Sequence, residues 1–217
     1  APRRGRTLPS KRRPKTAPRP LRRALFQASG NTTNSHRHMS SESLRGLMQR
    51  FAGEGRVEAI YLRPARLVPM VSVSEATAEP GRGLIGDRRS LALRTGELAQ
   101  KREVTLIQAE HVPDIASWLG LPSLDSARLR RNLVVSGINL VSMRSLFADV
   151  QLQWHFGEGA VLEVTGSCDP CSRMESELGR GGYNAMRGHG GMTARVLVGG
   201  TIRVSDAIRL RTLEPGA

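Results

Sequence analysis

The chain has two cysteines, and both lie in one motif, Cys168-Asp-Pro-Cys171. Such a pair could be redox-active, bind a soft metal, or pack as two small buried side chains. A strand is predicted over 161–165 before the motif and helical turns over 172–178 after it, so the start of a helix could stabilise a thiolate here. Spacing alone does not separate a reactive thiolate from a packed thiol, and both interpretations stay open.

Zinc is not expected at this motif. A structural zinc site needs four ligands, and the sequence has no second cysteine pair. The nearby candidate ligand is His189, which lies in the glycine-rich segment 188–191. We expect His189 to belong to a loop, although it could also line a pocket.

Arg130, Arg131 and Asn132 form a second group of residues that could do chemistry. They directly precede a short apolar strand predicted over 133–135. A guanidinium group matches the geometry of oxyanions, and a side-chain amide can both donate and accept hydrogen bonds. The group could therefore bind an anion, or it could be a solvated turn.

The glycines of GRGLIG, residues 81–86, match the spacing of a dinucleotide-binding loop, but their context does not. That motif needs a strand before it and a helix after it, whereas segment 87–93 begins with charges and then alternates like a strand. We interpret the glycines as a turn that brings Asp87 and Arg88 to a fixed position.

The elements that must position these residues are mostly short strands. Alternating apolar residues and turn signals predict many strands and few helices, without a repeated strand-helix-strand period. Two glycines, 199 and 200, predict a hairpin turn between strands 195–198 and 201–204. An α+β fold resembling a β-barrel follows. The further predicted strands are 57–62, 67–73, 104–107, 151–156 and 161–164, the last two as an antiparallel pair, and the predicted helical segments are 42–51, 110–119, 172–178 and 183–186.

Composition divides the 217 residues into two parts. Residues 1–38 hold eleven of the 33 Lys and Arg residues and no acid, which leaves 22 basic and 19 acidic residues, a net charge of +3, in residues 39–217. Residues 1–38 are expected to be a disordered basic tail or leader, and 39–217 a single domain. The net charge of +14 therefore does not by itself indicate a nucleic-acid-binding protein.

The location of the protein is suggested by two absences in the sequence. No run reaches the roughly 18 consecutive apolar residues of a membrane span, and the single cysteine motif offers no disulfide framework. We expect a soluble, cytoplasmic protein.

In their order along the chain, these motifs resemble the MOSC domain, which is the C-terminal module of molybdenum cofactor sulfurases and also occurs alone. GLIGDR, residues 83–88, resembles the family's early G-x-x-G-D element, and KREVTLI, residues 101–107, its central strand. RNLVV, residues 131–135, resembles its R-N element, and Cys171 occupies the place of its late cysteine. The resemblance extends from about 57 to 210. The segment 168–195 is similar to small bacterial stand-alone members.

The resemblance implies a β-barrel-like fold and a site around Cys171. Cys171 would ligate molybdenum of a molybdopterin cofactor or carry sulfur as a persulfide, with Cys168 as a resolving thiol. Arg88, Arg131 and Arg195 would bind the cofactor phosphate or another small anion. Asn132 would orient that ligand, and Asp87 would fix the arginines.

Several functions remain open at this point. The resemblance implies a cysteine desulfurase or a molybdoenzyme as partner, and sulfur transfer or cofactor-dependent catalysis as activity, without deciding whether the protein is an enzyme. Pyridoxal phosphate is associated only with the family as a whole. The alternatives are nucleic-acid binding through the basic tail, which we consider unlikely, and a scaffold of this fold without chemistry.

Overall fold

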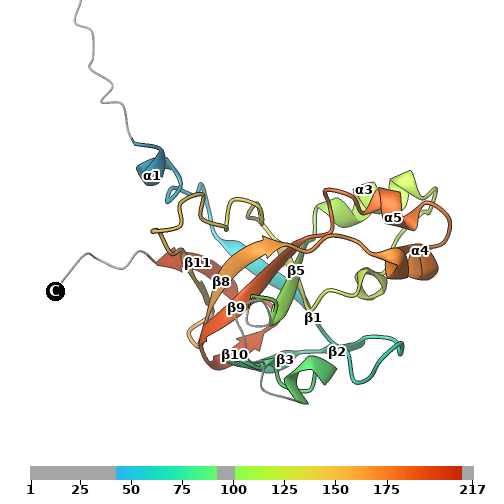
Figure 1. Ribbon diagram of the computed structural model, residues 1–217, viewed down its shortest axis with the longest axis horizontal. Coiled ribbons are helices and arrows are strands. Elements are labelled where there is room, and N and C mark those ends of the chain that lie inside the picture. The colour runs from blue at the N-terminus through green and yellow to red at the C-terminus, as the bar shows by residue number, and fades with distance from the viewer. Residues whose placement is uncertain (1–42, 92–100, 212–217) are drawn as a thin grey trace, which may run out of the picture. The chain divides into compact units, whose positions relative to one another are not determined.

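Seven short strands, each with apolar residues on the face that points inward, close into a β-barrel (Figure 1). The computed structural model describes residues 43–91 and 101–211, so the predicted basic tail lies outside the described residues. The order around the barrel is β11-β7-β8-β9-β5-β6-β1, and pairing of β1 with β11 closes the ring. This arrangement confirms the predicted α+β barrel. The barrel strands are β1 (Gly55–Leu62), β5 (Val104–Gln108), β6 (Leu133–Ser136), β7 (Gln153–Phe156), β8 (Ala160–Ser167), β9 (Met192–Val198) and β11 (Ala207–Arg211).

The pair β5 and β6 is parallel, whereas the other strand pairs of the barrel are antiparallel. All five residues of β5 are buried, because one face meets the barrel interior and the other a layer of helices. Helix α3 (His111–Trp118) and the 3-10 helix η2 (Ser126–Leu129) connect the two strands. A crossover of this kind is what a parallel pair requires.

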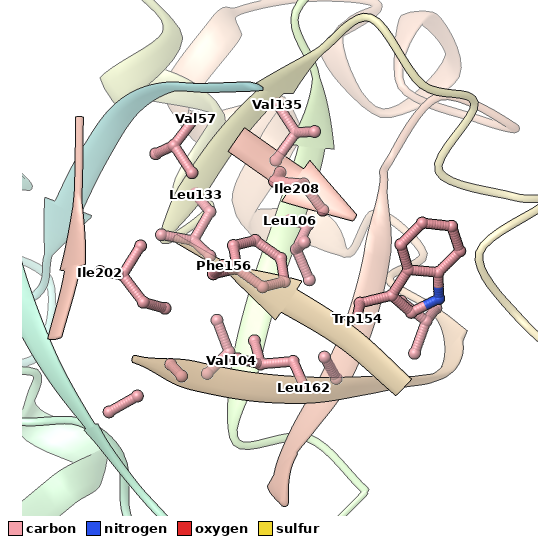
Figure 2. Close-up of a cluster of buried hydrophobic side chains, with 14 of the residues drawn as sticks. Val57, Val104, Leu106, Leu133, Val135, Trp154, Phe156, Leu162, Ile202 and Ile208 are labelled. Atoms are coloured by element: carbon pink, nitrogen blue, oxygen red, sulfur yellow. The ribbon is translucent and has the colours of Figure 1, made fainter. Parts of the chain in front are cut away.

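The barrel interior is filled by apolar side chains from every barrel strand (Figure 2). Trp154 and Phe156 of β7 are fully buried there, and the Trp154 indole donates a hydrogen bond to the Met143 carbonyl at 2.8 Å. The predicted antiparallel pair of strands around residues 157–159 is confirmed, with Trp154 opposite Leu162. No polar group of the tryptophan is therefore left without a partner inside the barrel.

A second apolar cluster lies between the outer face of the barrel and the helices. Helices α3, α4 (Ser172–Leu178) and α5 (Gly182–Ala185) gather on one side of the barrel (Figure 1). Ile107 of β5 packs there with Ile115 of α3 and Met186 after α5. None of the helices in the described part of the chain is long and apolar enough to cross a membrane.

A small second sheet replaces the hairpin that was predicted around Gly199 and Gly200. It has the order β10-β3-β4 and consists of β3 (Glu75–Glu79), β4 (Gly83–Leu84) and β10 (Gly200–Arg203). β9 pairs with β8 along its length and with β5 at residues 192–194 only, whereas β10 pairs with β3. The hairpin prediction was wrong, because β10 takes its partner from the second sheet, and the Val196 N–H of β9 donates to the Glu103 carboxylate instead of to a neighbouring strand.

Three other predicted boundaries were also wrong. The first helix, α1, spans only Leu44–Leu47, because glycine at position 46 weakens it and Leu44 and Leu47 remain exposed. The strand predicted over 67–73 shortens to β2 (Val71–Val73), and Leu67 has a positive φ of 67° that a strand excludes. The segment after Asp87 forms a 3-10 helix, η1 (Arg88–Leu91), instead of a strand.

Candidate functional site

The two cysteines lie in different environments at the end of β8. Cys168 is buried, and its backbone N–H donates to the Gly191 carbonyl at 2.9 Å. Cys171 is exposed and directly precedes α4. One thiol is thus packed against the barrel while the other is open to a ligand.

Cys171 and Cys168 line a cavity of about 330 Å³ together with eight arginines. We call this the arginine cavity. Asp169 is the acidic residue among its lining. Arginine is positively charged at any physiological pH, so a ligand in this cavity meets a strongly positive surface. The arginines come from the loop after β1, from η1, and from the segments before β5, before β6 and in α4; they are Arg63, Arg66, Arg88, Arg89, Arg102, Arg130, Arg131 and Arg173.

A buried polar network supports one wall of the arginine cavity. Asp87 is 2% exposed, and its Oδ2 accepts hydrogen bonds from Arg63 Nε at 2.8 Å and from Asn132 Nδ2 at 2.9 Å. The Asn132 Oδ1 accepts from Arg63 Nη2 at 3.1 Å and from Thr105 Oγ1 at 2.8 Å. The remaining Asn132 N–H donates to the Tyr61 carbonyl. Each partner thereby fixes the others.

The electrostatics of Asp87 follow from this network. Burial raises the pKa of the Asp87 carboxyl, but the charge of Arg63 and the hydrogen bonds from Arg63, the Arg89 backbone and Asn132 outweigh it, so the pKa is lowered. Asp87 is therefore ionised at neutral pH. Because Asp87 stays charged, it is better suited to position Arg63 than to accept and release a proton.

Arg131 holds the cysteine segment in place. Its guanidinium donates to the carbonyl oxygens of Gly190 at 2.7 Å, Leu129 at 2.8 Å and Cys168 at 2.9 Å. The pKa of Arg131 is lowered, because burial outweighs the opposing effect of the neighbouring Cys168 and Cys171. Arg131 therefore lies within electrostatic reach of both thiols, and a thiolate at either position would be in its field.

Two more arginines bind the loop between β1 and β2. Arg130 Nη1 donates to the Val68 carbonyl at 3.0 Å, and Arg173 Nη2 donates to the Leu67 carbonyl at 3.4 Å. Glu177 of α4 accepts from both guanidinium groups. These contacts explain how the positive φ of Leu67 is maintained at the edge of the cavity.

Arg66 and Arg88 differ from the arginines described so far. Both side chains are exposed and line the arginine cavity, and neither has a hydrogen-bond or ion-pair partner within residues 43–91 and 101–211. Their guanidinium groups therefore keep their full capacity to donate hydrogen bonds to a ligand. They are the residues of this cavity best suited to contact an anion directly.

The structure brings together most of the residues predicted from the sequence. Cys168, Cys171, Arg88 and Arg131 all line the arginine cavity. Asp87 and Asn132 lie in the network behind its wall, with their polar atoms engaged by the protein, and Asn132 accepts a hydrogen bond from Arg63.

Arg195 does not reach the cavity. It lies on β9 directly opposite Glu163 of β8, and its Nε donates to the Glu163 carboxylate at 2.7 Å. The structure therefore places Arg195 apart from the other residues predicted to bind the ligand, with its guanidinium in a cross-strand ion pair. His189, as expected for a loop residue, is absent from the cavity lining described above; its ring packs against His111 and Trp118.

Arg63, Arg66 and Arg173 were not predicted. Arg63 had a detectable signal, because it is a charged residue placed between the apolar strand 57–62 and Pro64, where the backbone is held extended. Arg66 and Arg173 had none, since an isolated arginine on a loop or short helix is indistinguishable from a solvated one.

A β-barrel with one parallel pair, and an exposed cysteine in an arginine cavity, define the class of this protein. Residues 93–209, more than half of the chain, match the model of the MOSC domain family. The chain belongs to this family, as its motifs predicted. No curated protein matches it.

Solved structures show the same fold. A YuaD protein from Bacillus subtilis superposes with a TM-score of 0.59 at 20% identity, covering 75% of this chain and 98% of that one. YiiM from Geobacillus stearothermophilus gives 0.55 at 14% identity, covering 73% and 75%. YiiM from Escherichia coli gives 0.51 at 16% identity, covering 74% and 72%. At these identities the likeness establishes the fold alone.

Proposed function

We propose that this protein binds an anionic cofactor, the phosphate-bearing molybdopterin of molybdenum cofactor, in the arginine cavity, and that Cys171 carries sulfur or ligates the metal there. The observation that carries the proposal is an exposed cysteine in a cavity lined by eight arginines. A phosphate is bound most strongly by guanidinium groups, which can donate two parallel hydrogen bonds each.

The residues present fit this cofactor. Arg66 and Arg88 have free donors for the phosphate, and Asp87 and Asn132 hold Arg63 beside them. The Cys171 thiolate is a soft ligand of the type that molybdenum accepts. When bound, the cofactor would supply a redox-active metal, while the chain supplies the anion site, the sulfur ligand and the positive field.

Sulfur carriage uses the same geometry. The Cys171 thiolate attacks the terminal sulfur of a donor persulfide, which leaves a persulfide on Cys171 and releases the donor thiolate. A cysteine desulfurase is the donor class that supplies such a persulfide. An acceptor thiolate on a partner, such as a molybdoenzyme, then attacks the terminal sulfur, which leaves the persulfide on the acceptor and regenerates the Cys171 thiolate.

Cys168 could also resolve the persulfide on Cys171. Its thiolate can attack Cys171 Sγ, which forms a disulfide between the two cysteines and releases hydrosulfide. An external thiol must then reduce the disulfide. Because Cys168 is buried and Cys171 exposed, the outer cysteine is the one that meets the donor.

Anaerobic purification of the full chain followed by metal analysis, pterin fluorescence and mass spectrometry of Cys171 tests the proposal. We expect molybdenum with pterin, or an added sulfur of 32 Da on Cys171. Cys171→Ser should lose the modification, whereas Cys168→Ser should retain it. Absence of molybdenum, pterin and sulfane sulfur from native protein, together with unchanged behaviour of Cys171→Ser in cells, would refute it.

A further inference from the structure

A second cavity also borders the cysteine segment, through Ser167 and Asp169. It has a volume of about 350 Å³ and is lined by the loop 139–146 and the segment 188–192. Asp169 lines both this cavity and the arginine cavity. The two spaces therefore adjoin through one residue, but the arginines of the first cavity do not line the second.

One wall of the second cavity is backbone without side chains. Gly190 and Gly191 line it, and a Cβ atom at these positions would overlap the carbonyl oxygens of Cys168 and Leu106, respectively. Gly191 also has a φ of 86°, which other residues rarely adopt. Both positions therefore require glycine because the neighbouring backbone packs closely against them, and this part of the cavity wall carries no side chain, which leaves room for a flat ligand.

Apolar side chains supply the other wall. Leu140, Val141 and Leu146 line the cavity from the loop between β6 and β7. Val141 is 63% exposed and Leu146 is 71% exposed. An apolar ligand that covers these exposed side chains would remove apolar surface from water, which favours binding.

The charged groups of the second cavity come from different elements. The side chain of Arg144, on the 139–146 loop, has no hydrogen-bond or ion-pair partner in the described ranges 43–91 and 101–211. Asp169 accepts one hydrogen bond, from Ser167 Oγ at 3.1 Å, and retains further acceptor capacity. In contrast, Gln108 is engaged with Glu110 and with the Leu140 backbone.

We propose that the second cavity binds a small organic acid with a flat apolar body. Its carboxylate pairs with Arg144, its body lies between the glycine wall and Val141, and a hydrogen-bond donor on the body faces Asp169. Apart from Asp169, this site shares no lining residue with the arginine cavity, so the protein holds two ligands in adjoining sites at the cysteine segment.

Isothermal titration calorimetry of the full chain with 4-aminobenzoate tests the proposal, with neutral 4-aminobenzamide as the matched ligand. We expect the acid to bind about tenfold more tightly than the amide, as the loss of one charge-assisted hydrogen bond implies. Arg144→Gln should abolish this preference without weakening the amide. Val141→Trp, a substitution at an exposed position, should block both ligands by filling the cavity.

Two variants of the arginine cavity separate this proposal from the proposed function. Arg88→Gln and Cys171→Ser should leave 4-aminobenzoate binding unchanged. If Arg88→Gln weakens the acid and Arg144→Gln does not, the acid binds in the arginine cavity and the second site is refuted, while the proposed function stands. Failure of 4-aminobenzoate to bind, or equal binding to Val141→Trp, also overturns it.

Discussion

The arginine cavity has an inner layer and an outer layer, and arginine side chains have opposite environments in the two layers. In the inner layer, Arg63 and Arg131 are nearly buried, and their guanidinium groups donate to Asp87, Asn132 and main-chain carbonyls. In the outer layer, Arg66 and Arg88 are exposed and make no such bonds with the residues that the structure describes.

The difference shows how a cluster of like charges can be built into a small domain. A buried charge is tolerated only when a counter-charge or hydrogen bonds from the protein replace its water, so the inner arginines are committed to the fold. The outer arginines stay solvated and need no protein partner. Substitutions in the inner layer should therefore affect stability, and those in the outer layer should affect ligand binding.

The largest effect is expected from Asp87→Asn, which leaves Arg63 buried without its counter-charge. We expect the free energy of unfolding to fall by about 3–5 kcal/mol, measured by urea denaturation. The matched control is Glu163→Gln, which unpairs the half-exposed Arg195 and should cost about 1 kcal/mol or less. Equal losses in the two variants would contradict the distinction between a buried and a surface pair.

Acid should weaken the same inner layer. Because the pKa of Asp87 is lowered in the folded protein, its stabilisation is complete above the unfolded-state pKa, near 4, and is lost as the pH falls toward the lower folded-state value. The difference in unfolding free energy between the native chain and Asp87→Asn should shrink below about pH 4. A difference that stays constant down to pH 2 would show that the charge of Asp87 does not matter.

Gly190→Ala should disturb the junction between the inner layer and the cysteines. Its Cβ would overlap the Cys168 carbonyl, which accepts a hydrogen bond from Arg131. We expect a loss of about 1–3 kcal/mol and faster alkylation of Cys168, followed by mass spectrometry. At Gly188 a Cβ meets open space, so Gly188→Ala bears only the strain of its positive φ and should leave Cys168 protected.

In the outer layer, Arg88→Gln and Arg66→Gln should change binding and not stability. Each should weaken the affinity for inorganic phosphate by about tenfold, because one charge-assisted contact is lost, while the free energy of unfolding stays within about 0.5 kcal/mol. Calorimetry and urea denaturation at one salt concentration measure both. A large stability loss would place these arginines in the inner layer.

Arg195→Gln should have the smallest effect. Its ion pair with Glu163 is part-exposed, so we expect a loss of about 1 kcal/mol or less and unchanged phosphate affinity. Reduced phosphate binding by this variant would restore the role that the sequence resemblance implied for Arg195.

Sequence patterns were informative wherever a residue's role depends on its neighbours in the chain. The apolar alternation of strands such as 153–156 and the glycine turn before Asp87 were read from local sequence, and the order of the motifs indicated the family. The same reasoning failed at Gly199-Gly200, because a local turn signal does not report that the next strand pairs with β3 of the second sheet. It also misplaced Arg195, whose partner Glu163 comes from another strand.

By itself, the sequence determined a barrel of short strands, a MOSC-type order of motifs, and a pair of cysteines at one position. Only the tertiary structure decided that Cys171 is exposed and Cys168 buried, and which arginines surround them. The physical reason is that the arginine cavity draws on separate segments brought together by barrel closure, and no spacing along the chain encodes that convergence. Whether a guanidinium is committed to the fold or free for a ligand likewise depends on burial and partners that exist only in the folded protein.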